Sequence, residues 1–330
     1  MAFELILPFF PEPLQALILD PAVADVCING SSGVYVERQG VIAKVEGLTM
    51  PPDHLNAAIE QIARVLGQDI TEQDPILDTR LPNGSRVAAV YPPCSPGGAT
   101  VTIRKFNHWF STDQLVEMGS LPAPIRNQIV SAILDRRNVL ISGGTGSGKS
   151  TLLNALIAHI PATDRLVVIE KPMELEIKND NAVRWEAVDA LPGRTAKTVA
   201  HLVAAALRHR PDRIIVGEVR DESAYNMLQA MNTGHSGSMT TTHADSALLA
   251  LHRISDLALS AHANLDHGFV RSQTADAIHY VVQVSRHRDG HRRVTELVEV
   301  LGYDTRLHTF RVQHRFGQPA QSGGDGTYCL

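Results

Sequence analysis

The chain has 330 residues, of which 44% are hydrophobic and 20% are charged. Its formal net charge of −5 argues against a protein that coats nucleic acid or anionic membrane. No apolar stretch approaches the roughly 18–20 residues that cross a bilayer, and the N-terminal residues lack the basic region of an export signal. We therefore expect a cytoplasmic protein of one to three domains, with Cys27, Cys94 and Cys329 reduced.

Residues 1–106 predict a small α+β domain. Short strands are expected at 23–29, 33–38 and 100–104, and a helix at 54–66 carries apolar residues at helical spacing. Pro-Asn-Gly-Ser at 82–85 lies between apolar runs, which is typical of a β-hairpin. Residues 107–122 are interpreted as a linker between this domain and the next.

Residues 123–305 predict an α/β domain, because helices alternate with short, continuously apolar strands. Strands of this kind are usual in a parallel sheet that is buried on both faces. They are expected at 139–142, 166–170 and 214–218, with helices at 149–160, 196–208 and 222–232.

The last part of the sequence predicts a hairpin and a tail. Strands at 278–284 and 294–300 flank the turn Asp289-Gly290. The basic run at 286–293 is interpreted as a solvated loop, with a surface for an acidic partner as the alternative. Residues 306–330 are interpreted as a C-terminal tail, and their Gly- and Gln-rich end favours disorder.

A phosphate-binding loop is predicted at residues 143–150, which read GGTGSGKS between an apolar strand and a helix. Glycines allow backbone N–H groups to surround phosphates, and the helix dipole favours the same anion. Lys149 is expected at the β- and γ-phosphates and the Ser150 hydroxyl at Mg²⁺. The predicted nucleotide-binding residues of this loop are Gly143, Gly144, Thr145, Gly146, Ser147, Gly148, Lys149, Ser150 and Thr151.

Carboxylates end two of the other predicted strands. Glu218 follows Ile214-Ile215-Val216-Gly217, as in a Walker B element, and its length favours contact with Mg²⁺ through water. Glu170 ends the strand at 166–170, on the edge where α/β sheets bind ligands, and Glu174 follows. We expect Glu170 to orient or deprotonate the attacking water, with Glu174 as the alternative.

Two histidines, His235 and His243, flank a strand of small and hydroxyl residues. Their spacing, without a nearby Cys or acidic ligand set, is poor for a zinc site. A histidine both donates and accepts hydrogen bonds, so we expect this pair to sense the γ-phosphate.

Together these segments resemble the type II/type IV secretion ATPase superfamily. Its four boxes match a Walker A at 143–151, an Asp-box-like VVIEKPMEL at 167–175, an extended Walker B at 207–221 and a His box at 232–244. Residues 26–40, 77–87 and 100–106 resemble the N-terminal domain of these ATPases. The compact length is most similar to the conjugal-transfer branch, with pilus assembly or type II secretion as the alternative.

The resemblance implies a RecA-like P-loop domain behind a smaller, PAS-like α+β domain, assembled as a homohexameric ring. The implied activity is ATP hydrolysis with Mg²⁺, at the cytoplasmic periphery of the inner membrane. The implied partners are inner-membrane components of a secretion or conjugation machine, without direct binding of nucleic acid. The resemblance further implies that Arg80, Arg86 and Arg104 complete the nucleotide site, since the guanidinium fork binds phosphate well.

One position departs from the family pattern, whose Asp box usually reads Ile-Glu-Asp. Here it reads Ile169-Glu170-Lys171, so either the activity is altered or Lys171 pairs with Glu174 or another acid. Two other functions stay open. A nucleic-acid-stimulated motor is disfavoured by the net acidity and the 5% aromatic content, whereas Lys171 favours a nucleotide-gated docking scaffold with low turnover.

Overall fold

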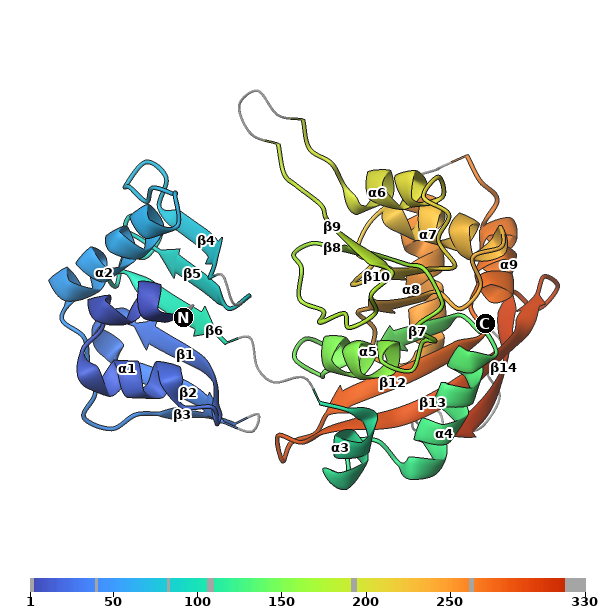
Figure 1. Ribbon diagram of the computed structural model, residues 1–330, viewed down its shortest axis with the longest axis horizontal. Helices are drawn as coiled ribbons and strands as arrows, with labels where there is room; N and C mark the ends of the chain where they lie inside the picture. The colour runs from blue at the N-terminus through green and yellow to red at the C-terminus, as the bar shows by residue number, and fades with distance from the viewer. Residues whose placement is uncertain are drawn as a thin grey trace. The chain divides into compact units, whose positions relative to one another are not determined.

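The computed structural model describes residues 3–38, 41–81, 84–105, 110–190, 195–260 and 264–317 (Figure 1). They form two compact units, Met1–His108 and Trp109–Leu330. Each unit has a hydrophobic core of its own. None of the helices in the described ranges combines the length and the apolar character needed to cross a membrane.

The described part of the first unit is a six-stranded antiparallel sheet with helices, in the strand order β3-β2-β1-β6-β5-β4. The strands are β1 (Val23–Asn29), β2 (Val34–Arg38), β3 (Val41–Lys44), β4 (Ile76–Arg80), β5 (Arg86–Val90) and β6 (Thr100–Arg104). The helices are α1 (Glu12–Leu19) and α2 (Pro52–Val65), with short 3-10 turns η1 (Phe3–Leu5), η2 (Leu7–Phe9) and η3 (Gly30–Ser32).

The local patterns explain this first unit well. The apolar face of α2 is buried in the same core as Val26 and Ile103 of the sheet. The predicted hairpin is confirmed, since β4 pairs with β5 and Arg80 lies opposite Arg86. Pro82 and Asn83 of its turn lie outside the described residues.

In the described part of the second unit, eight strands form one sheet in the order β14-β13-β12-β7-β11-β10-β8-β9. The strands are β7 (Val139–Ser142), β8 (Leu166–Glu170), β9 (Ala182–Glu186), β10 (Arg213–Val216), β11 (Met239–Thr242), β12 (Tyr280–Arg286), β13 (Arg292–Asp304) and β14 (Thr309–Phe316). Neighbouring strands in the part of the sheet that runs β12-β7-β11-β10-β8-β9 pair in parallel. The neighbours in the part β14-β13-β12 pair antiparallel.

Helices cover both faces of this sheet (Figure 1). They are α3 (Thr112–Glu117), α4 (Ala123–Leu134), α5 (Lys149–Ile157), α6 (Val199–Ala206), α7 (Ser223–Asn232), α8 (Ala247–Ser260) and α9 (His267–Ala277). Val139 and Ile141 of β7 share a core with α3, α4 and α5, while Leu140 shares a core with α6 to α9. Burial on both faces explains why β7, β8 and β10 are continuously apolar.

The predicted linker and tail both differ from the structure. Residues 107–122 contain α3, which begins with a capping box between Ser111 and Gln114. Leu115 of this helix is buried in the core that α3, α4 and α5 share with β7. Residues 309–316 of the predicted tail form β14, because their backbone pairs with β13 and Phe310 is buried in the core that contains α8 and α9. Residues 318–330, where disorder was expected, lie outside the described residues.

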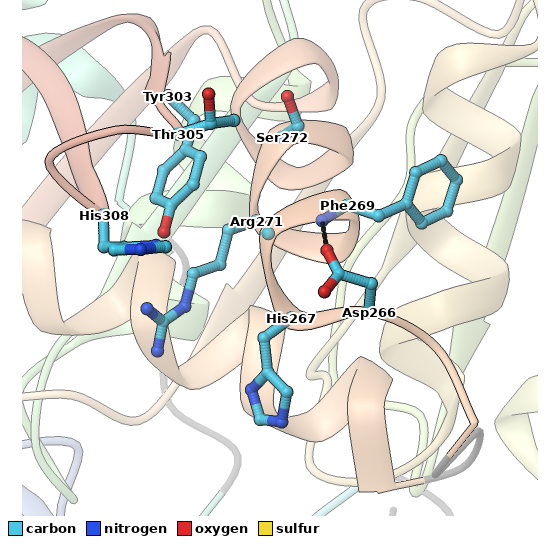
Figure 2. Close-up of a pocket in the computed structure, with 9 residues that line it drawn as sticks. Asp266, His267, Phe269, Arg271, Ser272, Tyr303, Thr305 and His308 are labelled. Carbon is cyan, nitrogen blue, oxygen red and sulfur yellow. Dashed lines mark hydrogen bonds between the residues drawn. The ribbon is translucent and has the colours of Figure 1, made fainter.

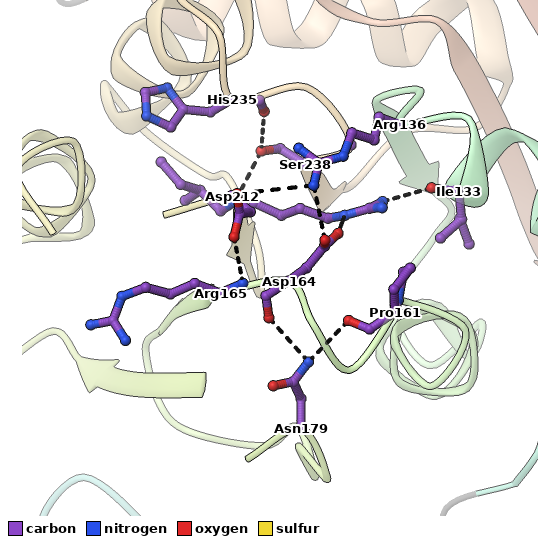
Figure 3. Close-up of polar contacts among 12 residues, drawn as sticks. Ile133, Arg136, Pro161, Asp164, Arg165, Asn179, Asp212, His235 and Ser238 are labelled. Carbon is purple, nitrogen blue, oxygen red and sulfur yellow. Dashed lines mark hydrogen bonds and ion pairs between the residues drawn. The ribbon is translucent and has the colours of Figure 1, made fainter. Parts of the chain in front are cut away.

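A buried ion pair fastens the edge at which the parallel strands begin. Arg213 opens β10 without solvent exposure, and its Nε donates to Asp164 Oδ2 at 2.7 Å. Asp164 also accepts from Arg136 at 2.8 Å (Figure 3). A Cβ on Gly237 would fall 2.6 Å from the Arg213 guanidinium, so the glycine makes room for it. This network ties α4 to the strands whose opposite ends carry the candidate site.

Candidate functional site

The parallel register gathers the predicted residues at one edge of the second sheet. Ser142 of β7 lies beside Thr242 of β11, so the loop after β7 begins level with His243. Val216 of β10 lies beside Ile169 of β8, which brings the segment before Glu218 level with Glu170. Carboxyl ends of parallel strands are where α/β sheets bind ligands.

The loop at 143–148 has the backbone geometry of an anion cradle. Gly143, Gly146 and Gly148 have φ angles of 158°, 68° and 97°, and the last two lie in the left-handed region that favours glycine. A Cβ on Gly143 would fall 2.2 Å from the carbonyl oxygen of Val284, so no other residue fits there. Gly148 directly precedes α5, which aims its N-terminal N–H groups at the loop.

Lys149 is held inside this loop. Its ammonium donates to the carbonyl oxygens of Gly143 and Gly144, at 2.9 Å each, and Nζ lies 3.4 Å from Nδ1 of His243. The side chain is buried, and desolvation lowers the pKa of the ammonium while the nearby Glu218 opposes that shift. The positive charge therefore lies inside the loop rather than in solvent.

His243 joins Lys149 to Glu218. Nε2 of His243 lies 2.8 Å from Oε1 of Glu218, although the angle is not that of a directed hydrogen bond. Burial lowers the pKa of His243, and the Glu218 carboxylate partly reverses this effect. Oε2 of Glu218 accepts from Arg220 at 2.6 Å, which raises the pKa of the guanidinium. The predicted residues Lys149, Glu218 and His243 are thus neighbours.

Threonines of β11 hold the segment that carries Glu218. The Thr241 hydroxyl donates to the carbonyl of Gly217 at 2.8 Å, and the Thr242 hydroxyl donates to that of Val219 at 3.2 Å. The N–H of Val219 donates to the carbonyl of Thr241 at 2.9 Å. These contacts fix the backbone on both sides of Glu218 and give the hydroxyl-rich strand a structural reason.

Glu170 is a buried carboxylate beside the same segment. It is 3% exposed, and Oε1 accepts from the backbone N–H groups of Glu174 and Leu175 at 2.8 and 3.0 Å. Oε2 has no hydrogen bond among the described residues and lies 3.7 Å from Arg184. Burial raises the pKa of Glu170. A Cβ on Gly217 would fall 3.0 Å from Glu170 Cγ, so glycine permits this approach.

The departure from the family pattern has a structural outcome. Lys171 forms an ion pair with Asp189, not with Glu174. The expectation that Lys171 pairs with an acid is therefore confirmed, with Asp189 as the partner. Glu174 provides a backbone donor to Glu170, and its negative charge acts to raise the pKa of that carboxyl. Glu170 is accordingly the more deeply placed of the two predicted acids.

His235 lies away from this cluster. It precedes β11, whereas His243 follows it, and the four residues of this strand span about 13 Å. Nδ1 of His235 lies 3.2 Å from the carbonyl of Ala230, near the end of α7 (Figure 3 shows its backbone contact with Ser238). His243 therefore joins the cluster around Lys149, whereas His235 lies at the other end of β11.

The three predicted arginines of the first unit, Arg80, Arg86 and Arg104, form a row. Arg80 of β4 lies opposite Arg86 of β5, which lies opposite Arg104 of β6. Directly opposed residues project from the same face of a sheet. Arg104 also pairs with Asp25 through Nε at 3.1 Å. The three arginines therefore share one face of the sheet, a relationship that only strand register creates.

Gln283 is a site residue that the sequence analysis missed. It is 1% exposed; its side-chain oxygen accepts from the Ser142 hydroxyl, and its amide donates to the carbonyl of Ala244 at 3.1 Å. It thereby joins the strand before the loop to the residue after His243. A lone amide inside the apolar run Tyr280–Val284 was the available signal.

A cavity of about 450 Å³ lies elsewhere in this unit (Figure 2). It is formed by the start of α9 and the turn between β13 and β14, with Arg271, Tyr303 and His308 among its lining residues. None of its lining residues belongs to the cluster around Lys149. The candidate site is therefore defined by loop geometry and not by this cavity.

The comparisons with known proteins agree on one family. The model of the family described as "Type II/IV secretion system protein" matches residues 11–308. The conjugal transfer protein TrbB of Rhizobium radiobacter is 34% identical over 92% of this chain and 91% of its own length. The type IV secretion system protein PtlH of Bordetella pertussis is 34% identical over 88% of this chain and 94% of its own.

The solved structures include a similar fold. The X-ray structure of the Legionella pneumophila ATPase DotB aligns with a TM-score of 0.65 and 22% identity. The alignment covers 89% of this chain and 80% of that chain. At this identity the likeness concerns the mixed α/β fold.

Proposed function

Because the chain belongs to the family of type II/IV secretion system proteins, we propose that it is a Mg²⁺-dependent ATPase that energises type IV secretion or conjugal transfer. The single observation that carries this proposal is the chain of contacts from Lys149 through His243 to Glu218, directly beside the phosphate loop. The similarity to a conjugal transfer protein and to a type IV secretion protein supports the choice of machine.

The described residues fit a nucleotide and its metal ion. The glycine cradle leaves no space for a side chain at Gly143, and Lys149 points its charge into the loop. Ser150 directly follows Lys149 at the start of α5 and would hold Mg²⁺, with Glu218 acting through water. When bound, Mg²⁺ neutralises charge on the β- and γ-phosphates.

Glu170 has the properties of the group that activates water. Its raised pKa brings a carboxylate closer to the range in which a general base works at neutral pH. Oε1 is fixed by two backbone donors, which leaves Oε2 to accept a proton from water. Glu170 would hold that proton at Oε2, while Lys149 would stabilise the charge that develops on the phosphate oxygens.

His243 would report the γ-phosphate. Its lowered pKa keeps the imidazole neutral at pH 7, so one ring nitrogen donates while the other accepts. It touches Lys149 on one side and Glu218 on the other. A change at the phosphate would therefore pass to Glu218 and to the segment held by the β11 threonines.

The proposed assembly is a homohexameric ring at the cytoplasmic periphery of the inner membrane, with components of the secretion machine as partners. The second unit would be its RecA-like motor and the first unit its PAS-like domain. The sheet order around β7, with parallel neighbours β12 and β11, supports the RecA-like assignment. The row Arg80, Arg86 and Arg104 would complete the nucleotide site.

Phosphate release from Mg-ATP by the purified full-length chain tests the proposal. We expect Lys149→Ala to lower the rate of phosphate release by at least about a hundredfold, since it deletes the charge at the transferring phosphoryl group. The matched control is Lys178→Ala, outside the loop, and it should retain activity. Unchanged turnover in Lys149→Ala would overturn the mechanism. Nucleotide binding without turnover by the unmodified chain would favour a docking scaffold, and stimulation by DNA would favour a nucleic-acid motor.

A further inference from the structure

The basic hairpin between β12 and β13 lies against the phosphate loop. Because β12 runs parallel to β7 with Gln283 beside Ser142, the end of β12 continues alongside the residues that follow Ser142. The backbone carbonyl of Val284 fills the space where Gly143 would carry a Cβ. The solvated loop expected from the sequence is therefore, at its base, a wall of the phosphate loop.

Arg292, the first residue of β13, is bonded to the loop itself. Its Nε donates to the carbonyl oxygen of Gly146 at 2.8 Å. Its methylene stem runs over Gly148, where a Cβ would fall 3.4 Å from Arg292 Cδ. The absence of side chains at Gly146 and Gly148 lets one arginine lie along the outside of the loop.

Arg286, the last residue of β12, lies directly opposite Arg292 in the antiparallel ladder. Its guanidinium NH1 lies 3.9 Å from the place that a Cβ on Gly146 would occupy. The side chain is exposed, and among the described residues no carboxylate lies within ion-pair distance of it. Arg286 therefore places an exposed positive charge beside Gly146 of the phosphate loop.

We propose that Arg286 is a phosphate-binding residue of the nucleotide site, supplied by the β12–β13 hairpin, and that Arg292 holds the loop against it. The inference rests on the proposed function, because it assigns these groups to the same nucleotide. A guanidinium fork donates two parallel hydrogen bonds to phosphate oxygens, which suits a group approaching from outside the N–H cradle.

The test is titration of the full-length protein with fluorescent N-methylanthraniloyl ATP and ADP in the presence of Mg²⁺. Arg286→Ala should weaken ATP binding about tenfold or more, the effect of losing one charge-assisted hydrogen bond. Arg286→Lys should recover part of it, because it keeps the charge but not the fork. Added salt should weaken ATP binding by the unmodified protein more than ATP binding by Arg286→Ala.

Two control variants separate this inference from the proposed function. Arg288→Ala removes an exposed arginine from the turn of the same hairpin and should leave affinity unchanged. If Arg286→Ala binds ATP within twofold of the unmodified protein while Lys149→Ala does not, the inference fails and the proposed function stands. Equal losses in Arg286→Ala and Arg288→Ala would also overturn it, as a general charge effect. If neither Lys149→Ala nor Arg286→Ala changes binding, both ideas fail.

Discussion

Nε2 of His243 lies 2.8 Å from Oε1 of Glu218, while Nδ1 of the same ring lies 3.4 Å from the ammonium of Lys149. One imidazole therefore touches both the cation of the phosphate loop and the acid that follows β10. Its two nitrogens allow it to contact groups of opposite charge at once, which neither a lysine nor a carboxylate could do.

Replacing His243 should separate hydrolysis from binding. We expect His243→Ala to lower steady-state phosphate release about a hundredfold while nucleotide affinity changes only a few-fold, because Lys149 and the glycine cradle stay in place. His235→Ala is the matched comparison at the other end of β11, and it should lower turnover much less. Equal losses in the two variants would contradict the role given to the His243 contacts.

Glu170→Gln should lower turnover by about a hundredfold or more, the range for loss of a general base. Glu174→Gln should lower it much less, since Glu174 approaches the buried carboxyl through its backbone N–H. Single-turnover hydrolysis measures the chemical step directly. If Glu174→Gln proves the more severe variant, the two acids have been assigned in the wrong order.

The Glu170→Gln substitution should also change how the stability of the protein depends on pH. Because burial raises the pKa of Glu170 above 4.5, the unfolded chain gives up this proton first as the pH rises. The charged carboxylate therefore costs folding free energy at neutral pH, and Glu170→Gln removes that cost. In denaturant unfolding, the free energy of unfolding of Glu170→Gln should increase relative to that of the unmodified protein as the pH rises above 4.5. A gap that is constant with pH would contradict the buried ionisation.

Gln283→Met should perturb the candidate site through the contacts that support it. It leaves the Ser142 hydroxyl and the Ala244 carbonyl without the amide, at about 1–3 kcal/mol for each buried polar group left unpaired. Turnover should fall with the free energy of unfolding, because His243 directly precedes Ala244. The same substitution at the exposed Gln313 should change stability by less than about 0.5 kcal/mol. Equal stability of the two variants would disprove the bridge.

Asp164→Ala should destabilise the second unit by about 3–5 kcal/mol, because it leaves Arg213 charged and buried. The exposed pair Asp289 and Arg293 offers the control, since Asp289→Ala should destabilise the unit much less than Asp164→Ala. Urea unfolding measures both. A small loss in Asp164→Ala would mean that water reaches Arg213.

Stability should fall as the pH falls below 6.5. Burial lowers the pKa of four histidines below this ordinary value: His159, His243, His252 and His279. Below pH 6.5 the unfolded chain binds protons before the folded protein does, so protonation favours unfolding. The midpoint temperature of thermal unfolding should fall between pH 7.5 and pH 5.5. It should depend less on pH in His279→Asn. A flat profile would contradict the shifts.

The sequence by itself determined the parts of the site that follow from short-range pattern. The strand bounds 139–142 and 166–170 agree with β7 and β8, because an apolar run buried on both faces has few other solutions. The glycines and Lys149 of the loop are fixed by the phosphate-binding conformation, which is local. The family followed from the same boxes and is confirmed over residues 11–308.

Only the tertiary structure decided which residues meet. The parallel register of β7 with β11 brings His243 to Lys149 and carries His235 away, although both histidines border one strand. Pairing of β12 with β7 turns Gln283 and the hairpin arginines toward the loop, from a part of the sequence about 140 residues further on. Contacts between distant segments depend on strand order and register, and these are properties of the assembled sheet rather than of any one segment.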